Sequence, residues 1–290
     1  MNVRAALTEG SCALEGSRPG SPFLDATLLL SLAMKLEKDR LLASMPEEVP
    51  PLALAEFRQL IRRRYLGEPV AYILGYKEFY GRRFTVDSRV LVPRPDTELL
   101  VELALSLLPA PRNKGRGDNS RQNLHCHDAY TGSGCVGVSI AAERPDVCVS
   151  LSDASPEALL VAGLNARNLI GRDLDLRPGQ VLSAAKAPLD LIVANPPYVS
   201  TSLTDSIVAE GGTEPRLALD GGDEGLDHYP LIVKQAFGLL SDGGALAVEI
   251  GEEQAGQVMA LFKAAGFEEI ASHADLAGCD RVVSGVKHAL

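Results

Sequence analysis

The stretch Asp128-Ala-Tyr-Thr-Gly-Ser-Gly-Cys135 separates a candidate strand at 124–130 from a candidate helix at 136–143. The small residues at 131–134 allow the backbone to turn sharply and approach a ligand closely, and the helix N-terminus that follows offers free N–H groups. With Gly137 the stretch also has the Gly-x-Gly-x-x-Gly spacing of dinucleotide-binding folds. The pattern indicates a nucleoside-containing cofactor and leaves NAD or FAD open. A tight turn without a ligand is the alternative.

Asp153 lies sixteen residues after Gly137, at the end of the next candidate strand. A carboxylate at this place can bind two ribose hydroxyls of a cofactor. It can equally cap the helix that is expected to begin near Pro156.

Strands and helices alternate from about residue 124 onward. Segments typical of strands lie at 124–130, 147–153, 190–194 and 245–250, and helical segments lie at 136–143, 156–169, 229–240 and 253–265. A last pair of segments, 269–274 and 281–286, is typical of an antiparallel hairpin at the edge of a sheet. This alternation predicts an α/β fold with a doubly wound parallel sheet.

The chain before residue 93 has a different character. Residues 1–66 are expected to be helical, with one helix opening at Ser21-Pro22 and another at 51–65. Residues 67–92 favour β structure, with a hairpin at 76–86 that turns at Gly81. The sequence therefore predicts a helical domain, 1–66, a β-hairpin linker, 67–92, and a catalytic domain, 93–290. Within the last, Asp96 is expected to cap a helix at 97–108, and the polar stretch 109–123 is expected to be an exposed, flexible loop.

Charge is spread unevenly over the 290 residues, whose formal net charge is −10. Residues 1–90 carry 13 Lys and Arg against 11 Asp and Glu, whereas residues 91–290 carry 15 against 27. An acidic catalytic domain disfavours a phosphate backbone as substrate and suits a cationic cofactor or a basic protein partner. No stable binding of nucleic acid is therefore expected.

The cysteines, at positions 12, 126, 135, 148 and 279, are scattered and form no C-x-x-C pair. They indicate reduced thiols in a cytoplasmic protein. A signal peptide is not expected, and neither is a membrane helix, because no apolar run approaches about 20 residues. His125 and His127 share one face of a strand, but no second cluster completes a metal site, so ordinary packing is expected there.

Asn195-Pro-Pro-Tyr198 directly follows the apolar strand segment 191–194, so it is expected at the ligand-binding edge of the sheet. The Asn195 side-chain oxygen and the Pro196 carbonyl can each accept one hydrogen of a planar NH₂ group. Pro197 stiffens the turn, and Tyr198 supplies a flat wall for a π-system. A plain Pro-Pro turn at the end of a strand is the alternative.

The same motif favours S-adenosylmethionine over a nicotinamide cofactor. An amide nitrogen is a poor nucleophile, and two acceptors can orient it toward a methyl donor and stabilise the charge that develops on it. An oxidoreductase would leave this motif unexplained.

Four further stretches strengthen this interpretation: Gly67-Glu-Pro-Val-Ala-Tyr-Ile-Leu-Gly75, Leu91-Val-Pro-Arg-Pro-Asp-Thr-Glu-Leu-Leu100, Glu214-Pro-Arg-Leu-Ala-Leu-Asp-Gly-Gly222 and Asp275-Leu-Ala-Gly-Cys-Asp-Arg-Val-Val283. Together with Asn195–Tyr198, they resemble the peptide chain release factor glutamine methyltransferases, the HemK or PrmC family. The resemblance runs from about residue 20 to 287. It implies a helical substrate-recognition domain, a β-hairpin linker and a Rossmann-like class I methyltransferase domain.

The resemblance also implies a reaction and roles for residues. A methyl group passes from S-adenosylmethionine to the glutamine side-chain amide in the Gly-Gly-Gln loop of class I release factors. Asn195, Pro196 and Tyr198 are the implied catalytic residues, and Pro197 joins them in holding the glutamine. The segment 93–98 is implied to lie beside the cofactor pocket. The residues implied to bind the cofactor are Tyr130, Thr131, Gly132, Ser133, Gly134, Asp153, Gln180, Val181 and Asn195.

Three positions depart from the family pattern. Tyr130 stands where a small residue is usual, and we expect it to crowd the methionine end of the cofactor or displace the loop. Gln180 replaces an acidic residue near the adenine, and Cys279 replaces an arginine. A protein that keeps the fold without catalysis is therefore an alternative.

Two other methyltransferase functions also remain open at this point, on adenine N6 of nucleic acid and on ribosomal-protein glutamine. The sequence predicts a monomer with class I release factors as partners.

Overall fold

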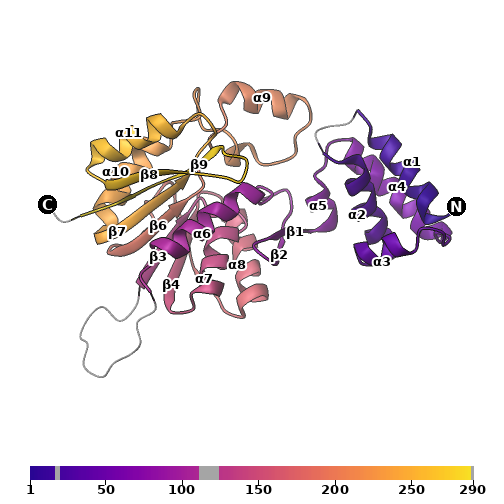
Figure 1. Cartoon of the computed structure of the whole chain (residues 1–290), viewed down its shortest axis with the longest axis horizontal. Helices are drawn as coiled ribbons and strands as arrows, with labels where there is room; N and C mark the ends of the chain where they lie inside the picture. The colour runs from indigo at the N-terminus through magenta and orange to yellow at the C-terminus, as the bar shows by residue number, and fades with distance from the viewer. Residues whose placement is uncertain (17–19, 111–123, 289–290) are drawn as a thin grey trace. The chain divides into compact units, whose positions relative to one another are not determined.

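The computed structural model describes residues 1–16, 20–110 and 124–288 (Figure 1). Except for residues 109 and 110, the loop expected at 109–123 lies outside these residues. The chain divides into two compact units, one of residues 1–76 with 207–213 and the other of residues 77–206 with 214–290. Each unit has its own hydrophobic core.

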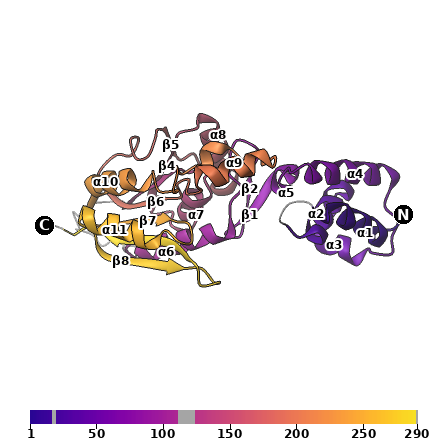
Figure 2. The same cartoon turned by 90° about the horizontal axis from the view of Figure 1, so that it is seen from above.

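The first unit is helical, as the sequence predicts. Its helices are α1 (Val3–Leu14), α2 (Pro22–Met34), α3 (Lys38–Ala43), α4 (Pro51–Tyr65) and α5 (Val70–Leu74). Seen from above, α4 runs along one edge of this unit with α1 to α3 beside it (Figure 2). The core consists of apolar side chains from these helices, among them the fully buried Leu7, Leu29, Leu41 and Phe57.

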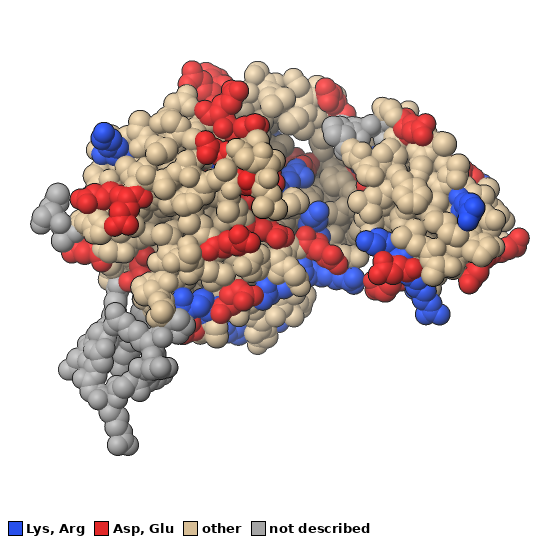
Figure 3. Space-filling model, viewed as in Figure 1, with Lys and Arg blue, Asp and Glu red and all other residues tan. Residues whose placement is uncertain are grey.

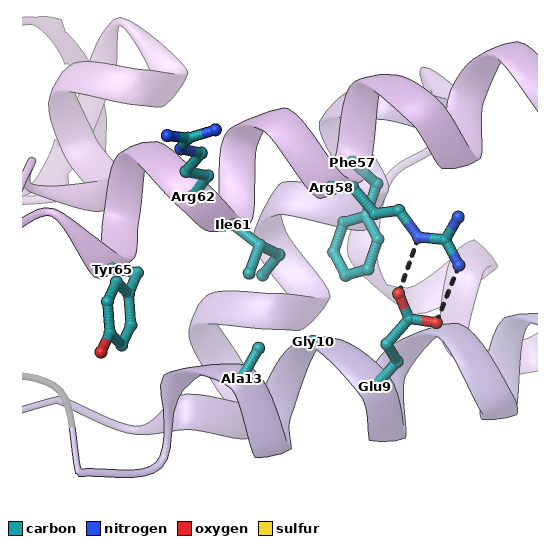
Figure 4. Close-up of a pocket in the computed structure, with 8 residues that line it drawn as sticks. All are labelled: Glu9, Gly10, Ala13, Phe57, Arg58, Ile61, Arg62 and Tyr65. Atoms are coloured by element: carbon teal, nitrogen blue, oxygen red, sulfur yellow. Dashed lines mark hydrogen bonds and ion pairs between the residues drawn. The ribbon is translucent and has the colours of Figure 1, made fainter.

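A shallow pocket lies between α1 and α4 (Figure 4). Glu9 of α1 and Arg58 of α4 face each other across it, and two hydrogen bonds of 2.7 and 3.0 Å join them. Tyr65 at the other end is 58% exposed. Because exposed ion pairs contribute little, at most about 1 kcal/mol, the apolar contacts of Phe57 and Ile61 hold the two helices together.

The second unit begins with a two-stranded hairpin and continues into a seven-stranded sheet. In the hairpin, β1 (Tyr76–Phe79) pairs with β2 (Arg82–Thr85). The sheet has the order β5-β4-β3-β6-β7-β9-β8. Its strands are β3 (Leu124–Ala129), β4 (Val147–Asp153), β5 (Asp175–Pro178), β6 (Leu189–Ala194), β7 (Leu240–Glu249), β8 (Glu268–Ala274) and β9 (Asp280–Val286). The first five run parallel, and β9 and β8 form the antiparallel edge.

Helices cover both faces of this sheet. On one face, α6 (Glu98–Leu107), α7 (Cys135–Glu143) and α8 (Pro156–Ile170) pack on the strands. On the other, α10 (Tyr229–Leu239) and α11 (Ala255–Ala265) do so. The α/β fold predicted from the sequence is confirmed. On the face drawn in Figure 3, Asp and Glu side chains are spread over the surface of this unit.

The register of the parallel strands brings the carboxyl ends of β3, β4 and β6 level with one another. Ala129 of β3 lies opposite Ser152 of β4 and Ala194 of β6. The loops that follow these three strands therefore leave the sheet side by side, which places the two motifs of the sequence at one edge.

The prediction that Asp96 caps a helix is wrong, because Asp96 lies within a 3₁₀ turn, η1 (Pro95–Thr97), that precedes α6. Its carboxylate lies instead 3.5 Å from the guanidinium of Arg281. The structure also adds elements that the sequence did not predict: helix α5, which lies in the segment 67–92 that was expected to favour β structure, the edge strand β5, helix α9 (Thr201–Ala209) and a second 3₁₀ turn, η2 (Arg216–Ala218).

Candidate active site

A cavity of about 450 Å³ opens at the carboxyl ends of β3, β4 and β6, within the second unit. The chain reverses its direction along the sheet between β3 and β6, and doubly wound sheets bind ligands at such a point. The volume lies within the range of ligand pockets, about 300 to 1,000 Å³. The lining residues fall within the stretches 89–97, 128–136, 153–158, 180–181, 195–197, 215–218 and 227–231.

The loop after β3 is held by the buried carboxyl of Asp128. Asp128 Oδ2 accepts hydrogen bonds from the Thr131 hydroxyl at 2.6 Å and from the Gly137 N–H at 2.9 Å. Burial raises the pKa of Asp128 to about 7, and these two hydrogen bonds oppose that rise. One carboxyl thus ties both ends of the glycine-rich loop to the strand before it.

Asp153 joins the same loop to the next strand. Its Oδ2 accepts from the Gly132 N–H at 2.9 Å, and its Oδ1 accepts from the Ser155 N–H at 2.8 Å. Burial raises its pKa as well. The side-chain cap of α8 is Ser155, whose hydroxyl accepts from the Ala158 N–H at 3.2 Å, so Asp153 is not that cap.

Tyr130 adopts a left-handed backbone conformation, with φ of 58°. Its hydroxyl lies 3.1 Å from Nδ1 of His228, and the two rings meet edge to face at 5.4 Å. Burial raises the pKa of Tyr130. Beyond this large residue, the loop is joined to β4 by the bond from the Gly132 N–H to Asp153. His228 also lines the cavity, and no motif in the sequence pointed to it.

The Asn195-Pro-Pro-Tyr198 motif follows β6, as expected. Asn195 Nδ2 donates to the Thr97 hydroxyl oxygen at 3.3 Å. No hydrogen bond to Asn195 Oδ1 is found among the described residues, so this oxygen is available as an acceptor. Pro196 and Pro197 are buried.

At the end of this motif, the Tyr198 hydroxyl donates to Glu249 Oε1 at 3.3 Å. Glu249 is the last residue of β7 and is 1% exposed. Burial raises its pKa to about 7, and the hydrogen bond from Tyr198 partly offsets this rise. A lone carboxylate in the apolar strand segment 245–250 was the one available signal for Glu249, and the sequence prediction missed it.

The cavity brings together most of the predicted site residues. It is lined by Tyr130, Thr131, Gly132, Ser133, Asp153, Gln180, Val181, Asn195 and Pro197. Gly134, Pro196 and Tyr198 are not among the lining residues. Gly134 is the N-cap of α7, and Tyr198 is turned toward Glu249. The expected segment 93–98 contributes Pro93, Arg94 and Thr97.

His127 is fully buried, and both of its ring nitrogens are within hydrogen-bond distance of serine hydroxyls. Its Nδ1 lies 2.8 Å from the Ser150 hydroxyl, and its Nε2 lies 2.9 Å from the Ser152 hydroxyl. Within the described ranges, no group of three or more His, Cys, Asp or Glu could hold a metal ion. A search of the same residues for a helix of membrane-spanning length and hydropathy found none.

Comparison with known proteins identifies the family. The PrmC N-terminal domain model matches residues 5–75, and the methyltransferase small domain model matches residues 118–211. A release factor glutamine methyltransferase of Moorella thermoacetica is 39% identical over 284 residues, covering 97% of each chain. That of Bordetella pertussis is 40% identical, covering 92% of this chain and 96% of the relative. The chain belongs to the release factor glutamine methyltransferase family.

Solved structures share the fold of this methyltransferase at low sequence identity. A methyltransferase of Pyrococcus furiosus has a TM-score of 0.52 at 14% identity and covers 73% of this chain and 92% of its own. The catalytic domain of hMettl16, solved with the MAT2A 3′UTR hairpin 6, has a TM-score of 0.54 at 11% identity and covers 72% of this chain and 77% of its own. The resemblance drawn from the sequence motifs is confirmed, and so is its methyltransferase fold.

Proposed function

We propose that this methyltransferase transfers a methyl group from S-adenosylmethionine to the glutamine side-chain amide in the Gly-Gly-Gln loop of class I release factors. The observation that carries the proposal is the Asn195 side chain, which lines the cavity with its oxygen unpaired among the described residues. Such an acceptor suits the NH₂ of a glutamine. The names of the relatives point to the same substrate.

The residues of the cavity fit the cofactor. A Cβ at Gly132 would meet no atom within 4 Å, so the backbone of this loop is open to a ligand. The two arginines among the lining residues, Arg89 and Arg94, pair with Asp87 and Glu214, which leaves the carboxylates of the cavity to favour a cation. We assign the ribose to Asp153, the adenine to Gln180 and Val181, and the methionine end to the loop 130–134.

When bound, S-adenosylmethionine supplies an electrophilic methyl group. The chain supplies orientation: the Asn195 side-chain oxygen and the Pro196 carbonyl each accept one N–H of the glutamine amide. These acceptors direct the nitrogen toward the methyl group and stabilise the positive charge that develops on it. Tyr198, fixed through its hydroxyl to Glu249, and Pro197 confine the planar amide. The nitrogen gains the methyl group and loses one proton to water.

The remaining assignments complete the proposal. The helical domain, 1–66, recognises the release factor, and the hairpin linker, 67–92, joins it to the catalytic domain, 93–290. The enzyme acts in the cytoplasm as a monomer and holds no nucleic acid stably.

Methyl transfer to a purified class I release factor tests this function. Labelled S-adenosylmethionine is supplied with the wild-type factor, and in parallel with a factor whose Gly-Gly-Gln glutamine is replaced by alanine. We expect label on the wild-type factor alone. Label on neither protein, with cofactor binding intact, would contradict the proposal, and the same assay with adenine-containing nucleic acid would then test methylation of adenine N6.

A further inference from the structure

The side chain of Gln254, the residue that precedes α11, contacts the carboxyl end of the Asn195–Tyr198 motif and is 9% exposed. Its Nε2 donates toward three backbone carbonyls, that of Tyr198 at 3.2 Å and those of Glu224 and Gly225 at 3.3 and 3.1 Å. We propose that Gln254 is a positioning residue that sets the direction of this motif from its carboxyl end. The inference rests on the proposed function, because it concerns the groups that hold the substrate amide.

The opposite end of the Gln254 side-chain amide is also held, and this decides how the amide is oriented. Gln254 Oε1 accepts from the Gly251 N–H at 2.9 Å and lies 3.3 Å from the Tyr229 hydroxyl. A backbone N–H can only donate, so Oε1 and not Nε2 faces Gly251. The two hydrogens of Nε2 are thereby directed at the carbonyls, which can only accept. If the amide were turned over, donors would meet donors and acceptors would meet acceptors.

Two glycines of the chain after η2 pack against the backbone of the motif. A Cβ at Gly221 would lie 2.6 Å from the Pro197 carbonyl oxygen. A Cβ at Gly225 would lie 2.1 Å from the Tyr198 carbonyl oxygen. The Gly221 N–H also donates to the Val199 carbonyl at 2.8 Å. The carboxyl end of the motif therefore has no room to move toward this part of the chain.

The motif itself is stiff, so a constraint at one end reaches the other. The rings of Pro196 and Pro197 fix two φ angles, and each residue that precedes a proline is restricted to extended conformations. Asn195 directly follows β6, so the sheet holds one end of the motif and Gln254 holds the other. A shift of the Tyr198 carbonyl should therefore turn the Pro196 carbonyl away from the substrate amide.

Gln254→Met removes the donors and keeps an unbranched side chain of similar length. The Tyr198 carbonyl then loses this partner, and we expect kcat with the release factor to fall about 100-fold, the cost of a displacement of about 1 Å. The Kd for S-adenosylmethionine should stay close to that of the wild type, because Asp128 and Asp153 hold the cofactor loop. A kcat equal to that of the wild type would overturn the proposal, as would a Kd that rises as much as kcat falls.

Gly225→Ala and Gly171→Ala form a matched pair that separates this role from a loss of stability. Both glycines have a left-handed backbone conformation, with φ of 71° and 66°, so an alanine is strained at either position. The new Cβ meets the Tyr198 carbonyl at Gly225 but no atom within 4 Å at Gly171, which ends α8. We expect both variants to melt at a lower temperature and only Gly225→Ala to lose kcat. Equal kcat in the two variants would contradict the role of the carboxyl end.

A second readout needs neither substrate nor cofactor. In protein labelled with 3-fluorotyrosine, the ¹⁹F signal of Tyr198 is assigned by its loss in Tyr198→Phe. This signal should shift in Gln254→Met and in Gly225→Ala, and it should stay in place in Gly171→Ala. An unmoved signal in Gln254→Met would overturn the proposal even if kcat fell. Because this measurement is independent of the acceptor protein, it decides the role of Gln254 even if the release factor proves not to be the substrate.

Discussion

Two buried carboxyl groups support the two loops of the active site, and they do so differently. Asp128, on the cofactor side, receives two donors at 2.6 and 2.9 Å. Glu249, on the substrate side, receives one from Tyr198 at 3.3 Å, and its second oxygen has no close partner among the described residues. Burial raises the pKa of each to about 7. The cofactor loop is therefore fixed in advance, whereas the substrate loop is held by longer bonds.

This difference suits the order of events in the proposed reaction. A fixed loop binds the cofactor without a further cost of ordering. Catalytic hydrogen bonds are often long in the free enzyme and shorten in the complex, and the 3.3 Å bonds of Asn195 and Tyr198 are of this kind. We infer that the substrate side tightens when the glutamine binds.

The largest expected effect is on the substrate side. Asn195→Ala removes the proposed acceptor for the substrate amide, and kcat should fall about 1,000-fold, or about 4 kcal/mol in barrier height. The Kd for S-adenosylmethionine should change much less, and the melting temperature should stay near that of the wild type. Single-turnover methyl transfer and calorimetry measure these effects. Turnover near wild type would show that the side chain is not an acceptor for the substrate.

A series of unfolding measurements at different pH values tests whether burial raises the pKa of Glu249. The folded pKa, about 7, is above the ordinary value of 4.5, so the folded state keeps a proton that the unfolded state loses between these pH values. The wild type consequently loses stability as the pH rises from about 4.5 to 7. Glu249→Gln has no such proton and does not lose this stability. Relative to the wild type, its free energy of unfolding should therefore rise by about 3 kcal/mol between pH 4.5 and 7.

Asp128→Asn is the matched control for the pH series. Both donors, the Thr131 hydroxyl and the Gly137 N–H, bond to one oxygen of Asp128, and an amide has only one oxygen that can take this place. Asp128→Asn, which must hold its amide in that one orientation, should therefore be less stable than wild type even at pH 4.5, where Glu249→Gln, which faces a single longer bond, should be close to it. Denaturant unfolding at several pH values measures both. The same low-pH loss in the two variants would remove the distinction drawn between the two carboxyls.

A smaller effect is expected from packing on the cofactor side. A Cβ at Gly137 would lie 2.0 Å from Leu151 Cδ2 and 2.8 Å from Asp128 Oδ2. Gly137→Ala should cost about 2 kcal/mol of unfolding free energy and weaken cofactor binding, because Asp128 must move. Gly238→Ala in α10, where a Cβ meets no atom within 4 Å, is the control and should be neutral or slightly stabilising. Equal effects of the two substitutions would show that this side is not tightly packed.

The sequence predicted the elements that carry the two motifs because their patterns are local. Strand β4 and the start of α8 at Pro156 lie where the sequence predicts them, although the cap of α8 is Ser155 and not Asp153. Strand β5 was missed because it is only four residues long, has no buried residue and ends at a proline. So short an alternation, without β-branched or aromatic residues, is a weak signal for a strand.

The partners of the site residues could not be predicted in the same way. Thr97 and Asn195 are 98 residues apart, and Tyr198 and Glu249 are 51 apart. Contacts of this kind depend on strand order and register, which residue types alone do not give. The sequence predicted most of the residues that line the cavity, and the fold was needed to find what holds them.

The smallest expected effect concerns Tyr130, which adds a second support to the cofactor side. Its hydroxyl bond to His228, 3.1 Å long, contributes about 1 kcal/mol. Tyr130→Phe loses this bond and frees the ring to enter the cavity that it lines. Part of the protein is then unable to bind, and the apparent Kd for S-adenosylmethionine should rise about three- to fivefold.

Tyr130→Gly separates the ring from the hydrogen bond. Glycine accepts the φ of 58° without strain, and it has no ring to block the cavity. Calorimetry should therefore find Tyr130→Gly binding at least as tightly as wild type, while Tyr130→Phe binds more weakly. If Tyr130→Phe binds like wild type, edge-to-face packing on His228 is sufficient to hold the ring, and Asp128 and Asp153 alone fix the cofactor loop. If Tyr130→Gly binds more weakly than Tyr130→Phe, the ring itself contacts the cofactor. The cofactor side then tightens when its ligand binds, as we infer for the substrate side.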